Sequence, residues 1–116
     1  MITDIPDMCC IELYSSETEA LWVNVWAEIK DRKLTVQGQD LGGPVEKWFG
    51  SDEFEYELRF DESNTRKLLS ILSENGSDPI EMLKERFSGP RGFWELKDFC
   101  DEANIQYEYF SWHSHD

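Results

Sequence analysis

The acidic residues are the first candidates for chemistry. Glu53, Glu55 and Glu57 stand at every second position of the segment EFEYELRF. In an extended strand, which rises about 3.3 Å per residue, these carboxylates lie on one side at a spacing of roughly 6.6 Å. Such a row repels itself, and a cationic partner relieves the repulsion. The row therefore predicts a surface for a positively charged protein. The alternative is a solvated sheet face whose charge discourages aggregation.

The same carboxylates are poor candidates for catalysis. General acid–base chemistry needs two carboxyl groups in contrasting environments within one cleft, whereas neighbours on one exposed strand face share an environment. The only histidines, His113 and His115, stand among the last four residues, where a ligand set frays and chelates metal weakly. No EF-hand loop, H-x-x-E pattern or phosphate-binding loop is present. We expect no enzyme, no catalytic residue, no metal and no cofactor.

Tryptophans provide the second candidate for binding. Residues 20–30 alternate, with an apolar set from Leu21 to Ile29 on one side and Trp22 and Trp26 on the other. If helices cover the apolar side, Trp22 and Trp26 must be buried by something else. The candidates are the turn around Trp48, the chain ends and a partner. Trp and Tyr are enriched at binding hot spots, although core packing is their commoner fate.

The last strand raises the same question. Either Tyr107 and Tyr109 or Phe110 and Trp112 must face away from the helices. We predict a partner-binding surface made of residues from three segments: Trp22, Trp26, Glu53, Glu55, Glu57, Tyr107 and Tyr109.

Periodicity predicts the elements that position these residues. Apolar residues alternate with polar ones in strands over residues 8–14, 20–30, 33–38, 53–60 and 105–112. Three helices are expected: one capped by Ser63 or Asn64 and ending near Glu74, one capped by Ser77 or Asp78 with Pro79 first, and one over residues 93–103. The glycine-rich segment 38–43 predicts a break, and residues 44–49 predict one helical turn. The element order predicts an α+β fold: a mainly antiparallel sheet of about five strands, with two or three helices packed on one face.

Length and charge limit the function further. The chain has 116 residues and 13.7 kDa, which is typical of one domain, and we expect flexible ends at about 1–7 and 113–116. Its 11 basic and 25 acidic residues give a net charge of −14, which argues against direct binding to nucleic acid or an anionic membrane. Three cysteines, two of them adjacent, are a poor disulfide framework and predict reduced, packed thiols. No apolar run is long enough to span a membrane, and the first residues lack the pattern of a signal peptide, so we expect a cytoplasmic protein.

Several stretches together resemble a known group of proteins: GQDLGG after a strand, EFEYELRF, the helix beginning NTRKLLSIL, and the helix from Gly92 to Cys100 that leads into IQYEYFSW. Across residues 30–112 the chain resembles small acidic bacterial proteins that are often found beside toxin genes and are treated as immunity-protein-like. The resemblance implies an α+β fold and a role in toxin neutralisation, and it implies no catalytic residues.

The leading hypothesis is therefore a non-enzymatic protein that neutralises a cognate, basic protein toxin through an acidic and aromatic surface. The alternative is a homo-oligomeric structural or adaptor domain. In that alternative, the tryptophans or the last strand bury against a second copy, and pairing through residues 106–112 makes a homodimer.

Overall fold

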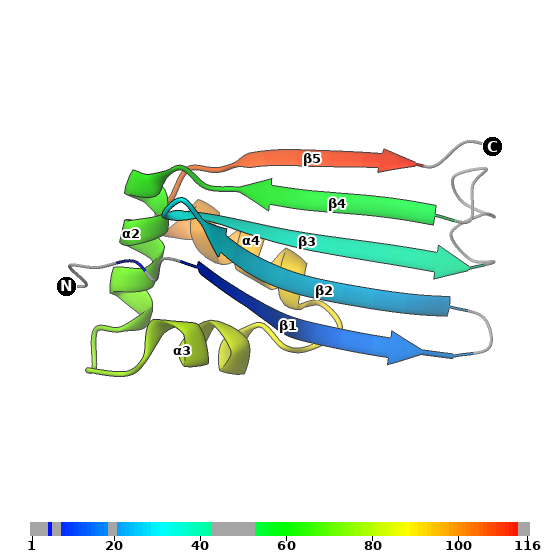
Figure 1. Ribbon diagram of the computed structural model, residues 1–116, viewed down its shortest axis with the longest axis horizontal. Helices are drawn as coiled ribbons and strands as arrows, with labels where there is room; N and C mark the ends of the chain where they lie inside the picture. The colour runs from blue at the N-terminus through cyan, green and yellow to red at the C-terminus, as the bar shows by residue number, and fades with distance from the viewer. Residues whose placement is uncertain (1–4, 6–7, 19–20, 43–52, 114–116) are drawn as a thin grey trace.

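The centre of the protein is one antiparallel sheet in which strands adjacent in sequence are adjacent in space (Figure 1). The computed structural model describes residues 5, 8–18, 21–42 and 53–113. The strand order is β1-β2-β3-β4-β5. The strands are β1 (Met8–Glu17), β2 (Leu21–Lys30), β3 (Lys33–Gly42), β4 (Glu53–Arg59) and β5 (Glu108–His113). Strands β1 and β5 are the two edges.

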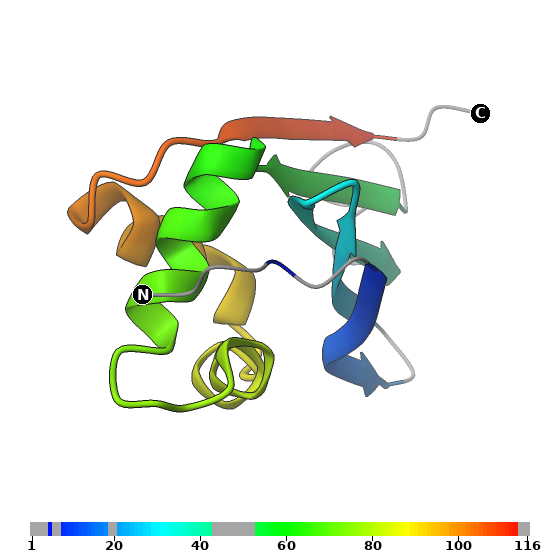
Figure 2. The same cartoon turned by 60° about the vertical axis from the view of Figure 1, so that its left-hand side comes forward.

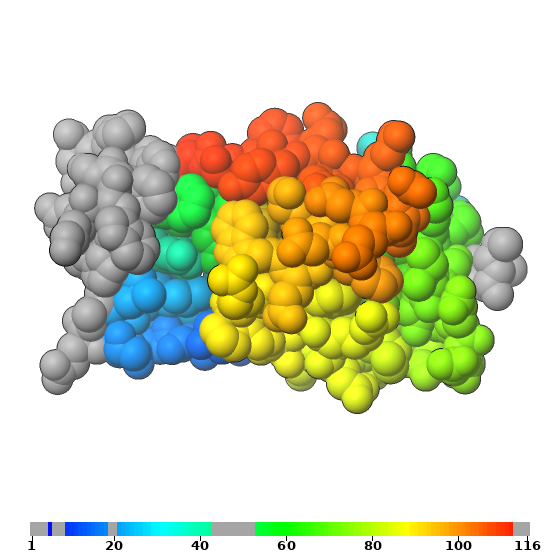
Figure 3. All heavy atoms as spheres, turned by 180° about the vertical axis from the view of Figure 1, so that it is seen from behind, coloured from blue at the N-terminus to red at the C-terminus, as the bar shows by residue number. Residues whose placement is uncertain are grey.

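Three described helices, placed between β4 and β5 in the chain, cover one side of this sheet (Figure 2). They are α2 (Glu62–Leu72), α3 (Pro79–Arg86) and α4 (Gly92–Glu102). Seen from behind, they form the surface that hides much of the sheet (Figure 3). This arrangement confirms the predicted α+β fold. None of the described helices has the length and apolar composition needed to cross a bilayer.

The core lies between the helices and the facing side of the sheet. On β2, Val25, Ala27 and Ile29 are at most 3% exposed, as the alternation of residues 20–30 predicts. The other strands and the helices add residues that are fully or almost fully buried: Leu34, Val36, Leu58, Leu68, Leu69, Leu83, Phe93 and Leu96. The opposite side chains of each strand therefore point away from the core.

The hairpin between β2 and β3 confirms the predicted short link. Lys30 pairs with Lys33, and the two residues between them, Asp31 and Arg32, have φ angles of 53° and 64°. Two consecutive positive φ values are typical of the type I′ turn, whose twist matches that of the flanking strands.

The predicted break at residues 38–43 is wrong for the part that the structure describes. Strand β3 continues to Gly42, and Gly38 pairs with Val25 on β2 and with Tyr56 on β4. The glycine serves packing here, because a Cβ on Gly38 would lie 1.9 Å from Cε2 of Tyr56. Glycine generally weakens a strand, so the sequence predicts a break here. The sequence does not show that the ring of Tyr56 packs over Gly38.

Several boundaries also differ from the prediction. Strand β1 extends to Glu17 through an irregularity between Glu12 and Tyr14, and β5 begins at Glu108 and not at residue 105. Helix α2 ends at Leu72, before the predicted Glu74, and Asp61 caps its start in place of Ser63 or Asn64. The Asp61 carboxylate accepts a 2.8 Å hydrogen bond from the Asn64 amide, which holds the pKa of Asp61 below its usual range.

The start of α3 confirms its prediction. Asp78 accepts a 2.9 Å hydrogen bond from the Ile80 amide, and Pro79 is the first helical residue. The predicted helical turn at residues 44–49, with Trp48, lies outside the described residues. So do most of the two predicted flexible ends. Ile5, within the first of these ends, is described and is 5% exposed against the core.

Candidate protein-binding face

The side of the sheet opposite the helices carries most of the predicted site residues, and no described helix lies in front of it in Figure 1. We call it the outer face. Its central members alternate with the core residues and are aligned by the strand register: Trp22, Asn24 and Trp26 of β2, Gln37 and Gln39 of β3, Glu53, Glu55, Glu57 and Arg59 of β4, and Phe110 and Trp112 of β5. Aromatic side chains thus flank a row of carboxylates on both sides.

Pairing of the strands sorts this face into transverse rows. One row runs from Trp26 through Gln37 and Glu57 to Phe110. The next runs from Asn24 through Gln39 and Glu55 to Trp112. Trp22 stands in the row that continues through Leu41 to Glu53. Five of the predicted partner-binding residues therefore share one surface.

The carboxylates of the row do not share one environment. Glu57 is only 4% exposed, and its carboxylate accepts hydrogen bonds of 3.0 Å from Nε of Arg59 and 3.0 Å from Nε2 of Gln37. Nη2 of Arg59 lies 2.9 Å from Oε2 of Glu57, the oxygen that Nε also contacts. The guanidinium stacks 4.3 Å from the centre of the Phe110 ring. The expectation of three equally wet glutamates is wrong for Glu57, because the arginine two residues along the strand neutralises it.

Glu55 has a different set of neighbours. Nε2 of Gln39 lies 3.2 Å from its Oε1 and is also bonded to Glu53. Burial raises the pKa of Glu55 above its usual range, and the hydrogen bond and negative charge of Glu53 raise it further, while a hydrogen bond from Trp112 partly offsets these effects. Within the described part of the chain, no lysine or arginine forms an ion pair with Glu55.

A small cavity opens beside Glu55. It has a volume of about 120 Å³ and lies between Trp26 and Trp112, with Gln37, Glu55 and the paired residues Gly38 and Tyr56 completing its lining. Strands β2 and β5 are three strand spacings apart, or about 14 Å, so the two indoles stand on opposite sides of this cavity. The carboxylate therefore lies between two aromatic walls.

One buried acceptor on the same face has no donor. Oδ1 of Asn24 is inaccessible to solvent, and no hydrogen-bond donor among the described residues reaches it. Buried polar atoms are normally hydrogen-bonded, because an unsatisfied one costs about 1–3 kcal/mol. Asn24 lies in the row of Glu55 and Trp112, so the unsatisfied acceptor belongs to the same surface.

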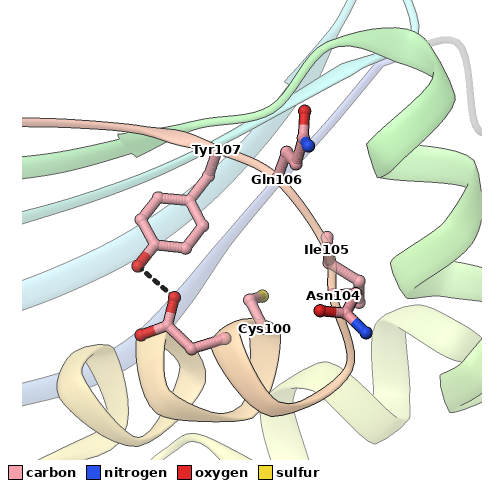
Figure 4. Close-up of a pocket in the computed structure, with 6 residues that line it drawn as sticks. Cys100, Asn104, Ile105, Gln106 and Tyr107 are labelled. Atoms are coloured by element: carbon pink, nitrogen blue, oxygen red, sulfur yellow. Dashed lines mark hydrogen bonds between the residues drawn. The ribbon is translucent and has the colours of Figure 1, made fainter.

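Tyr107 and Tyr109, the other predicted site residues, lie on the helix side. Tyr109 pairs with Leu58 and packs against Phe93 and Trp94 of α4, with ring centres 6.5 and 6.1 Å apart. The Tyr107 hydroxyl donates a 2.6 Å hydrogen bond to Asp101 (Figure 4). The structure thus separates these tyrosines from the outer face.

Sequence reasoning left out four members of the outer face that contact the acidic row: Gln37, Gln39, Arg59 and Trp112. The alternation of EFEYELRF places Arg59 beside the glutamates, and this signal was available in the sequence. The glutamines and Trp112 depend on the pairing register, which a single sequence does not determine.

A second cavity, of about 480 Å³, lies between the end of α4 and the approach to β5 (Figure 4). Cys100 points toward it but is fully buried as a residue, and burial raises the pKa of its thiol to about 12. A thiol of that kind stays protonated at neutral pH and is a poor nucleophile. Nζ of Lys67 donates a hydrogen bond to the backbone carbonyl of Asn104, and Oδ1 of Asn64 accepts one from the backbone amide of Gln106. These bonds point to a structural role for the segment that lines the cavity.

The other thiols differ from one another. Cys9 is partly buried, whereas Cys10 is exposed and does not fit the prediction of packed thiols. Among the described residues, no group of three or more histidine, cysteine, aspartate or glutamate side chains is placed to hold a metal ion.

A partly buried acid, Asp40, lies on the helix side of β3. Asp40 accepts a 2.7 Å hydrogen bond from the hydroxyl of Tyr56, whose ring packs on Phe93 and Trp94. Burial raises the pKa of Asp40, and the bond from Tyr56 offsets this only in part. Burial and the nearby carboxylate also raise the pKa of Tyr56.

This pair predicts a pH-dependent stability. A carboxyl group whose pKa is higher in the folded state than in the unfolded state carries no penalty below its ordinary pKa of 3.8, and it destabilises the fold progressively as the pH rises above that value. Asp40→Asn keeps an acceptor for Tyr56 and removes the charge. Urea unfolding is measured between about pH 3.5 and pH 7, the range in which carboxyl groups titrate. The free energy of unfolding of the variant should rise relative to that of the wild type as the pH rises. A constant difference would contradict the prediction.

No family model, curated protein or solved structure matches this chain.

Proposed function

We propose that this chain is a non-enzymatic binding protein of the immunity-protein kind, which holds a cationic protein toxin on its outer face and so neutralises it. The observation that carries the proposal is the sheet face that no described helix covers, where tryptophans border carboxylates and one buried acceptor has no donor among the described residues. Aromatic anchors inside a charged rim are the usual composition of a protein-binding hot spot.

The charge of the chain supports the same proposal. A net charge of −14 attracts a basic protein from a distance and accelerates the encounter. Glu55 places part of that charge next to Trp112, its partner across β4 and β5, so long-range attraction and the apolar anchor coincide on one surface. Neutralisation then follows from occupying or bordering the toxin's working surface.

A paired set of variants tests the proposal. The products of the genes adjacent to this one are each expressed in a bacterial host, with and without this chain. We expect one product to arrest growth, and we expect this chain to relieve the arrest and form a stoichiometric complex. Glu53→Lys with Glu55→Lys should weaken the complex by about tenfold or more, because both removed carboxylates lie at its centre.

The matched control carries the same change of charge on the opposite side. Glu81→Lys with Glu85→Lys alters two exposed residues of α3, far from the outer face. If the control weakens the complex as much as the outer-face variant, net charge alone explains binding and the outer face is not the interface. The proposal also fails if no adjacent product is toxic or binds.

One observation favours a second function, the homo-oligomeric domain. Strand β5 is a sheet edge, and Tyr109 and Trp112 on it are 39% and 43% exposed. A second copy could extend the sheet by pairing along this edge. Sedimentation at high protein concentration decides the matter, since a monomer contradicts this alternative.

A further inference from the structure

The protein contains one complete example of how its outer face holds a cation. Arg59 bonds the buried carboxylate of Glu57 through Nε at 3.0 Å and Nη2 at 2.9 Å, and its guanidinium stacks 4.3 Å from the centre of the Phe110 ring. Glu57 and Phe110 are direct partners across β4 and β5. A carboxylate and an aromatic ring in neighbouring positions therefore clamp one guanidinium.

A second pair of a carboxylate and an aromatic ring occurs two residues along both strands. Glu55 stands two residues before Glu57, Trp112 stands two residues after Phe110, and these two residues are again direct partners. Trp112 and Glu55 line the cavity of about 120 Å³ together with Trp26 and Gln37. The first pair holds Arg59, whereas no described lysine or arginine forms an ion pair with the second.

We propose that the cavity between Trp26 and Trp112 receives one arginine side chain of the cationic partner, whose guanidinium pairs with Glu55 and stacks on an indole. The inference rests on the proposed function and specifies the partner's chemistry at this site. Arginine fits better than lysine, because its planar guanidinium stacks on aromatic rings and bonds a carboxylate through two nitrogens. The Arg59 clamp uses both of these properties.

Peptides that differ only in one side chain test the inference. The probes are acetylated, amidated pentapeptides with arginine, lysine or citrulline between glycines, added to ¹⁵N-labelled full-length protein. Citrulline has the shape of arginine without its charge. Nuclear magnetic resonance follows the indole N–H signals, with Trp94 of α4, on the helix side, as the internal reference. We expect saturable shifts at Trp26 and Trp112 with the arginine peptide, with a Kd on the order of 10 mM for one exposed ion pair and ring contact.

Two variants define the expected specificity. Glu55→Gln should weaken the arginine peptide about fivefold or more, because it removes the charge and keeps the shape of the side chain. Glu108→Gln, an exposed residue of β5 outside the cavity lining, should leave the affinity unchanged. The lysine peptide should bind about threefold more weakly than the arginine peptide, and the citrulline peptide should cause no saturable shift.

Three results would overturn the inference. The first is equal binding of the arginine and citrulline peptides, and the second is no shift at either indole. The third concerns Lys47, the one cation in residues 43–52. If Lys47→Ala raises the affinity for the arginine peptide by more than about threefold, the chain's own lysine is the occupant. A toxin complex that depends on Glu53 and Glu55 while the peptides fail would overturn this inference alone, and peptide binding without any toxic partner would overturn only the proposed function.

Discussion

Gly38→Ala should lower the free energy of unfolding by about 3 kcal/mol. A Cβ at this position would lie 1.9 Å from Cε2 and 2.3 Å from Cζ of Tyr56. The ring cannot move aside freely, because Tyr56 is 3% exposed, packs against Phe93 and Trp94, and bonds Asp40 through its hydroxyl. Chemical unfolding measured by tryptophan fluorescence gives the value.

Two controls separate the clash from the general cost of changing a glycine. Gly89→Ala adds a methyl group whose nearest neighbour, Oε1 of Glu95, is 4.0 Å away, so this variant should change stability by less than about 0.5 kcal/mol. In a Tyr56→Leu background, Gly38→Ala should lose most of its effect, because the ring atoms that it would meet are gone. Equal costs in both backgrounds would contradict the proposed clash.

Thr65→Val should lower the free energy of unfolding by about 2 kcal/mol. The Thr65 hydroxyl accepts a 3.0 Å hydrogen bond from the backbone amide of Leu34, and both residues are 0% exposed. Valine has the same shape but no acceptor, so the amide of Leu34 would remain buried without a partner. That unsatisfied donor has a larger cost than the loss of a hydrogen bond that water could replace.

The serine variant is the matched control. Thr65→Ser keeps the hydroxyl and removes a methyl group, so it should cost about 1 kcal/mol from the lost apolar contact. The prediction requires the valine variant to be the less stable of the two in the same unfolding experiment. The reverse order would show that packing of the methyl group, and not the bond to Leu34, joins α2 to β3.

The two positions explain how the outer face is held in place. Gly38 lets Tyr56 lie flat between the sheet and α4, and Thr65 ties the start of β3 to α2. Both contacts lie on the helix side of β3 and β4, the strands that carry the glutamines and glutamates of the outer face. The described helices therefore support the outer face from behind.

Much of the fold was predictable from the sequence, because periodicity reports which side chains a strand or helix buries. The alternation of residues 20–30 and 53–60 identified β2 and β4 and their buried sides. Asp78 with Pro79 marked the start of α3. The same alternation placed Trp22, Trp26 and the glutamate row away from the helices, which is where the structure places them.

Only the tertiary structure decided how these residues meet. The pairing of β4 with β5 places Phe110 and Trp112 beside the glutamates and sends Tyr107 and Tyr109 to the helix side. A shift of one residue in that pairing would exchange the two sets, and no local pattern in a single chain determines the register. The neutralisation of Glu57 by Arg59 and the cavity beside Glu55 depend on the same register. The sequence by itself determined which residues of β2 and β4 belong to the outer face, and contacts between strands far apart in the chain determined which carboxylate is already paired with a cation.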